Sequence, residues 1–198
     1  YICYENGLKA HIKLMNTANM NCPIFYCVGN HDLVKGKYGE ELFESIYGPV
    51  FYSFDAGSVH YIVTPMAGGD YQPGYTKEDV YRWLKNDLAQ IPQGKPIVVF
   101  NHDLLTYGDQ FIFGINDQEQ INLKAWVYGH WHINYIKKQG NVYSVSTATL
   151  DKGGIDHSTS AFRVLHVDKK GDFTSELRYT YLDKSIQIST PAEGQVPV

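Results

Sequence analysis

The chain has 198 residues, of which 43% are apolar and 14% aromatic, which is enough to bury one sizeable core. Its formal net charge of −4 gives no general basic surface, so non-specific binding to nucleic acid or to membranes is not indicated. No apolar run approaches the roughly 20 residues that span a bilayer, so no transmembrane segment is expected.

The N-terminal part of the chain carries a helical pattern and then a strand-like run. Apolar residues spaced three and four apart predict an amphipathic helix that starts at Tyr1 and ends near Asn19, before Pro23. The next run, residues 24–28, is apolar throughout, which is typical of a strand covered on both faces of a sheet. We therefore expect a helix followed by a buried strand.

The middle of the chain predicts a helix, a hairpin and a second helix. Residues 38–47 have the pattern of a short helix. Residues 50–54 and 58–64 are rich in β-forming residues and flank a short turn, which favours a hairpin. Thr76 and Asp79 form a capping pair for the second helix. Its apolar stripe consists of Val80, Trp83, Leu84, Leu88 and Ile91.

The second half of the chain is rich in strands. Residues 96–100 and 125–128 are continuous apolar runs, as expected of buried strands. Four later runs have β character and are expected to complete one sheet of a two-sheet core. They are residues 133–138, 141–147, 161–167 and 173–181. We expect residues 1–183 to form one domain, and residues 184–198, which contain Pro and Gly and few large apolar residues, to be a linker or tail.

Three of the predicted buried strands are followed at once by a polar motif that contains histidine. These motifs supply Asn30, His31 and Asp32, then His102, then His130 and His132. In open α/β sheets, ligands bind outside the carboxyl ends of the strands, so we expect these side chains to lie together. Taken alone, the two histidines of the last motif are equally consistent with a solvated face of a strand.

The other four histidines have no such setting. We expect His11 on a helix face and His60 and His166 in alternating strands, all as ordinary structural residues. His157 lies in a Gly-rich loop that could reach a neighbouring cleft.

An asparagine amide together with several imidazoles indicates a metal site. Imidazole is a good ligand for zinc, iron or manganese, and an Asn carbonyl can add a neutral ligand. Two such ions about 3.5–4 Å apart stabilise both the attacking and the leaving oxygen of a phosphoryl displacement. A centre of this kind also needs carboxylates, one of which bridges the ions.

The motifs GNHD at residues 29–32, His102, and GHWH at residues 129–132 occur in this order, each after an apolar strand. In this combination they resemble the calcineurin-like metallophosphoesterase family. The segment YGPVFYSFDAGSVHYIV is also similar to the family's hairpin after GNHD. The resemblance extends over about residues 22–181. It implies an α/β fold, a four-layer α/β/β/α sandwich.

The resemblance implies a binuclear centre of manganese, iron or zinc. Asn30, His102 and His130 would bind one ion, and His132 would bind the other. The implied activity is a phosphoesterase that hydrolyses a phosphate ester with a metal-bound hydroxide as nucleophile. Monoesters, diesters and nucleotides remain open as substrates.

The resemblance also implies two residues that act on the substrate without binding metal. His31 would stabilise charge on the phosphoryl group or protonate the leaving oxygen, with Asp32 beside it to support its protonated form. The Tyr-rich loop of residues 68–76 could line the cleft and stack on a base or sugar, or be an ordinary loop.

The chain departs from the family pattern at its start. The family begins with a strand that carries Asp-x-His and a strand that ends in Gly-Asp, and neither element precedes GNHD here. We therefore expect this chain to be the C-terminal portion of a longer, periplasmic or secreted protein with additional domains. By itself it would bind one ion or none and be weakly active or inactive. The alternative is a mononuclear metal-binding or non-catalytic domain. Asp103 is the one local carboxylate that could substitute for the missing ligands.

Overall fold

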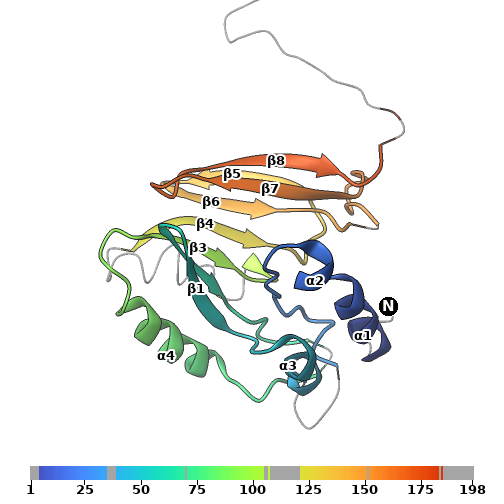
Figure 1. Ribbon diagram of the computed structural model, residues 1–198, viewed down its shortest axis with the longest axis horizontal. Helices are drawn as coiled ribbons and strands as arrows, with labels where there is room; N and C mark the ends of the chain where they lie inside the picture. Colours follow the sequence, from blue (N-terminus) through green and yellow to red (C-terminus); the bar gives the residue numbers. More distant parts are fainter. Residues whose placement is uncertain are drawn as a thin grey trace, which may run out of the picture.

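The computed structural model describes most of the chain as a mixed α/β domain (Figure 1). The residues that it describes are 5–34, 39–69, 71–104, 107, 121–150, 152–182 and 184. Among these residues, no helix has both the length and the apolar character needed to cross a membrane. Only Lys184 of the predicted tail is described, so the boundary between domain and tail stays a prediction.

A six-stranded mixed sheet organises the fold, in the order β1-β2-β3-β4-β6-β5. The four inner strands run parallel, and β1 and β5 pair antiparallel at the two edges. The strands are β1 Tyr52–Ala56, β2 Val59–Val63, β3 Pro96–Phe100, β4 Asn122–Tyr128, β5 Tyr135–Gln139 and β6 Val142–Ser146. Because parallel strands end at the same edge, the motifs that follow β3 and β4 must emerge together.

The two faces of this sheet are covered by different elements. Ile97 and Val99 of β3 contribute to the core that includes helix α4 (Lys77–Leu88). Val98, between them, contributes to the opposite core, which contacts strands β7 (Ala161–Val167) and β8 (Phe173–Tyr179). Burial on both faces explains why the sequence of β3 is apolar without alternation. The mixed α/β class is thereby confirmed, whereas the four-layer arrangement stays a prediction.

Helix α4 begins where the sequence predicts. Thr76 and Asp79 form a full capping box, and Val80, Leu84 and Leu88 are buried against the sheet. The helix ends at Leu88, so Ile91 of the predicted apolar stripe lies outside it. The Ile91 N–H donates to the Leu88 carbonyl in a tighter turn, because the next residue is a proline, which disfavours helical backbone in the residue before it.

The first predicted helix is wrong as a single element. It divides into α1 (Glu5–Leu14) and α2 (Thr17–Met20). Asn16 separates them: its side-chain amide donates to the carbonyl of Ile12, and its side-chain oxygen accepts from the N–H of Asn19 as the N-cap of α2. An Asn side chain competes with the backbone for hydrogen bonds, so one residue ends one helix and starts the next.

The strand predicted at residues 24–28 is also wrong. This segment has no ladder partner among the described residues and is not part of either sheet. It is held by side chains instead: the Tyr52 hydroxyl donates to the Tyr26 carbonyl at 2.9 Å, and the ring of Phe25 stacks on that of Phe54. An apolar run shows that a segment is covered, but a strand also requires a neighbouring backbone to pair with.

The helix at residues 38–47 and the hairpin after it are confirmed. The helix is α3 (Glu41–Tyr47), and Gly48 follows it at φ 94°. Strands β1 and β2 pair antiparallel around Gly57, whose φ of 60° suits glycine.

The four C-terminal β runs do form strands, but the prediction that they complete a single sheet is wrong. β5 and β6 join the main sheet, because β6 pairs in parallel with β4. β7 and β8 form a separate two-stranded antiparallel sheet. Alternating apolar residues identify each strand, but they carry no information about which neighbour it pairs with.

Candidate metal centre

The parallel pairing of β3 and β4 brings two of the three polar motifs side by side. Their hydrogen-bond ladder continues past the strand ends: the Asn101 N–H donates to the Val127 carbonyl at 3.0 Å, and the Gly129 N–H donates to the His102 carbonyl at 3.2 Å. His102 and His130 therefore leave neighbouring strands at the same level of the sheet.

The GNHD motif reaches the same edge in a tight turn. The Asp32 N–H donates to the Gly29 carbonyl at 3.0 Å, which places Asn30 and His31 at the tip of the turn. Gly29 lies directly against His102, since a Cβ added at Gly29 would lie 3.1 Å from three atoms of the imidazole ring. A larger residue at Gly29 would displace the ring.

Three predicted ligands converge at this point. Asn30 Oδ1 lies 3.0 Å from His102 Nε2 and 3.2 Å from His130 Nδ1, and the two ring nitrogens are 3.3 Å apart. Two imidazole nitrogens and an amide oxygen thus form a triangle. An amide oxygen only accepts hydrogen bonds, and a neutral imidazole has one nitrogen that only accepts. The amide oxygen and the two ring nitrogens can therefore direct three lone pairs at a single point.

The dimensions of the triangle fit a single divalent ion. Ligand atoms about 2.1 Å from a common ion lie about 3.0 Å apart at right angles and about 3.4 Å apart at the tetrahedral angle. The three observed distances fall within these limits. In the described part of the chain, no group of three or more His, Cys, Asp or Glu side chains is arranged to hold a metal, so the candidate site depends on the Asn.

The electrostatics of His102 keep its ring neutral. Burial, followed by the positive charge of His130, lowers the pKa of His102 to about 4. His31 and His132 act in the same direction, and the nearby Asp103 opposes them. At pH 7 the ring therefore carries no charge, as a metal ligand requires. These effects also show that histidines from all three motifs lie within electrostatic reach of one another.

A family model described as calcineurin-like phosphoesterase matches residues 4–134, about two thirds of the chain. The chain belongs to this family. The match includes all three polar motifs, and the mixed α/β sheet agrees with the family's fold. Members of the calcineurin-like phosphoesterase family are in general metal-dependent hydrolases of phosphate esters. No curated protein was found to match the chain.

His31 and Asp32 lie next to the triangle but do not form part of it. The partly buried Asp32 carboxylate accepts a hydrogen bond from the Gly29 N–H at 2.9 Å and so closes the turn. Burial raises the pKa of Asp32, while that hydrogen bond and the charges of His11 and His31 work against the rise. Asp32 is thus within electrostatic reach of His31, the neighbour that the sequence suggests for it.

The GHWH motif is a turn rather than the end of a strand. β4 ends at Tyr128, and both His130 (φ 62°) and His132 (φ 51°) adopt left-handed backbone, which is uncommon for residues other than glycine. Trp131, between them, donates from its indole Nε1 to the Asp103 carboxylate at 3.1 Å. Residues held in sparsely populated backbone conformations cluster at functional sites.

This turn separates the predicted ligands into two groups. His130 joins the triangle, whereas no hydrogen bond from the His132 ring to the triangle is seen in the described residues. The carbonyl of His132 accepts from the Ile155 N–H at 2.9 Å, so the Gly-rich loop does reach this edge of the site. His157, in the same loop, has left-handed backbone (φ 64°), but no described contact brings its ring to the triangle. Asp103 contacts Trp131 instead of completing the triangle.

Two supporting residues were not identified from the sequence. Asn101 is 3% exposed, and its side-chain amide donates to Thr64 Oγ1 at 2.7 Å and to the Pro65 carbonyl at 3.1 Å. Its Oδ1 accepts from the Asp103 N–H at 2.6 Å. These contacts fix the backbone on both sides of His102. A buried Asn directly between an apolar strand and a candidate ligand is the signal that points to such a role.

Gly69 is the second supporting residue. A Cβ at this position would overlap the carbonyl oxygen of Asn30, so only glycine allows the segment to pass this close. The beginning of the Tyr-rich loop therefore borders the site, as the sequence suggested. At the adjacent Gly68, a Cβ would meet no atom within 4 Å.

Proposed function

We propose that this chain carries one half-site of a binuclear phosphoesterase. Asn30, His102 and His130 would hold one divalent ion, and His132 would serve the second ion together with carboxylates from outside the described residues. The observation that carries the proposal is the triangle of donor atoms at 3.0, 3.2 and 3.3 Å. Bound manganese, iron or zinc would supply Lewis acidity and lower the pKa of a water molecule.

The chain's own residues would orient the ester and manage protons. His31, at the tip of the GNHD turn, would donate a proton to the ester oxygen that leaves. Asp32 would fix the turn that presents His31, through its hydrogen bond to the Gly29 N–H. His102, neutral because of its lowered pKa, would remain a ligand and take no part in proton transfer. The substrate class is a phosphate ester.

A second candidate is a mononuclear site without turnover. It is favoured by the fact that the triangle contains three ligands for one ion, while His132 lies outside it. The two functions differ in ion number and in hydrolysis, so one set of measurements separates them.

The experiment combines metal analysis with hydrolysis of a chromogenic monoester and a chromogenic diester. It would use four forms of the intact protein: the unchanged sequence, His31→Ala, His130→Ala and, as a matched control, His166→Ala, at an exposed position of strand β7. We expect His31→Ala to lower turnover far more than metal content, His130→Ala to lower both, and the control to change neither. Equal loss of metal in His31→Ala and His130→Ala would contradict the assigned roles.

A further inference from the structure

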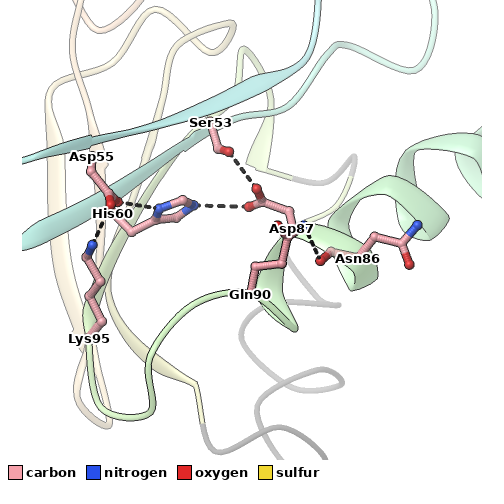
Figure 2. A network of polar contacts seen from close by, with 7 residues as sticks. All are labelled: Ser53, Asp55, His60, Asn86, Asp87, Gln90 and Lys95. Atoms are coloured by element: carbon pink, nitrogen blue, oxygen red, sulfur yellow. Dashed lines mark hydrogen bonds and ion pairs between the residues drawn. The ribbon is translucent and has the colours of Figure 1, made fainter.

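A second polar cluster lies at the opposite end of the parallel strands. His60 is at the beginning of β2, in register with Ile97 at the beginning of β3, whereas the metal triangle follows the end of β3. The His60 ring bridges two carboxylates: Nδ1 lies 2.7 Å from Asp55 Oδ1, and Nε2 lies 3.0 Å from Asp87 Oδ2 (Figure 2). His60 is 8% exposed, and its contact with Asp87 is largely shielded from water, whereas the Asp55 side chain on the other side of the ring is exposed.

The geometry of the cluster requires a proton on each ring nitrogen. Carboxylate oxygens accept hydrogen bonds, so both contacts are favourable only if His60 is an imidazolium. The remaining carboxylate oxygens are already engaged: the Ser53 hydroxyl donates to Asp87 at 2.6 Å, and the Lys95 ammonium donates to Asp55 at 2.6 Å (Figure 2). The three bridging residues come from three elements, Asp55 from β1, His60 from β2 and Asp87 from the last turn of α4.

We propose that Asp55, His60 and Asp87 form a charge-dependent clamp, which holds the end of α4 on the β1–β2 hairpin while His60 is protonated and loosens when His60 loses its proton. The charged groups that face His60 are the two carboxylates and, behind Asp55, the ammonium of Lys95. The clamp is separate from the metal triangle and does not depend on the proposed function.

The pKa shifts of the cluster define the pH range in which the clamp is closed. Burial opposes the charge on His60, but the hydrogen bonds to Asp87 and Asp55 outweigh it and raise the pKa of His60. A histidine whose pKa is raised in the folded state contributes its full stabilisation of the fold at pH values below its ordinary pKa of about 6.5. This stabilisation is lost as the pH rises through the raised pKa. The pKa values of Asp55 and Asp87 are lowered, so the clamp opens again in acid.

Loss of the His60 proton should affect the two sides of the clamp unequally. A neutral imidazole has one N–H and can donate to only one carboxylate. Asp55 retains Lys95 as a cationic partner, whereas Asp87 retains only the Ser53 hydroxyl among the contacts of Figure 2. We therefore expect alkaline pH to weaken the contact of His60 with Asp87 on α4 more than its contact with Asp55 on β1.

The direct test is a proton NMR titration of the histidine rings in the purified chain between pH 5 and 9. The reference is the ordinary histidine pKa of about 6.5. We expect the His60 ring to titrate above this value, and the backbone amides of residues 85–91 to shift over the same pH range. A His60 ring that titrates at or below this value, or amides that do not follow it, would overturn the proposal.

A variant gives a second, independent readout. His60→Gln removes the charge, and His166→Gln is the matched control. In urea unfolding, the unchanged chain and the control should lose stability as the pH rises from 6 to 9, while His60→Gln should show little of this loss. An alkaline loss of the same size in all three forms would also overturn the proposal. If His60→Gln does not fold, the NMR titration of the unchanged chain still decides.

Discussion

Two histidines in this molecule, the buried His60 and the partly buried His102, have pKa values shifted in opposite directions, because their neighbours differ. His102 is surrounded by other histidines and an amide oxygen, and its pKa is lowered to about 4. His60 lies between two carboxylates, and its pKa is raised although burial opposes this. Burial disfavours the charged form of both rings, and the partners decide whether this effect is reinforced, as at His102, or outweighed, as at His60.

This difference identifies which site can accept a metal ion. The His60 cluster already contains its cation, so a metal would have to displace a proton from a ring that two carboxylates hold. The triangle at Asn30, His102 and His130 consists of neutral donors and has no cation of its own. A site without carboxylates gains no charge neutralisation from its ligands, which is consistent with a half-site that further residues complete.

The largest effect is expected for metal binding. Loss of even an outer-shell partner typically costs 10–100-fold in metal affinity, so removal of the ligand His102 should cost at least that. We expect His102→Ala to abolish most of the manganese or zinc binding of the chain in calorimetric titration. His60→Ala should retain the affinity of the unchanged sequence. A comparable loss in both variants would show that the two histidine sites do not differ as described.

The acid side of the stability curve tests the lowered pKa of His102. A histidine whose pKa is lowered in the folded state does not reduce the free energy of unfolding above about pH 6.5. As the pH falls from 6.5 towards the pKa of the folded state, the unfolded chain binds a proton more readily, and the free energy of unfolding decreases. With a shift to about 4, the metal-free chain should lose roughly 3 kcal/mol in this range. Urea unfolding in the presence of a chelator would measure the loss. His102→Gln should flatten this part of the curve, whereas His60→Gln should flatten the alkaline part.

The two adjacent glycines allow a matched test of how closely the site is enclosed. A Cβ at Gly69 would overlap the Asn30 carbonyl, whereas a Cβ at Gly68 would meet nothing within 4 Å. Gly69→Ala should therefore displace Asn30 and weaken metal binding by roughly tenfold, and Gly68→Ala should leave it unchanged. Equal affinities in the two variants would indicate that Asn30 is not a ligand.

The sequence predicts which residues converge better than it predicts how the backbone holds them. The triplet Asn-His-Asp occurs at residues 30–32 and again at residues 101–103. In the first triplet the Asn reaches the triangle, and in the second the His does, while Asn101 turns into the core. The first triplet lies in a turn and the second extends a strand, and a three-residue pattern does not distinguish these conformations.

Errors in the predicted fold have a common physical cause. Asn16 divides a continuous helical pattern by its side-chain hydrogen bonds, and residues 24–28 lack a pairing neighbour in the described chain. Both outcomes depend on specific partners, whereas apolar periodicity reports only burial. The bridge from His60 to Asp87 was missed for the same reason, because the two residues are 27 positions apart and the alternating pattern around His60 does not indicate a partner.

The smallest expected effect concerns the support behind the triangle. Thr64→Val retains the shape of the side chain but removes the hydroxyl that accepts from Asn101 at 2.7 Å. The Asn101 amide keeps its contacts with the carbonyls of Thr64 and Pro65, so the loss should be limited to about 1 kcal/mol of unfolding free energy. Thr180→Val, at an exposed position, is the control and should change stability by less. If metal affinity falls in Thr64→Val as much as in Gly69→Ala, then Asn101 positions His102 more strongly than its four side-chain hydrogen bonds suggest.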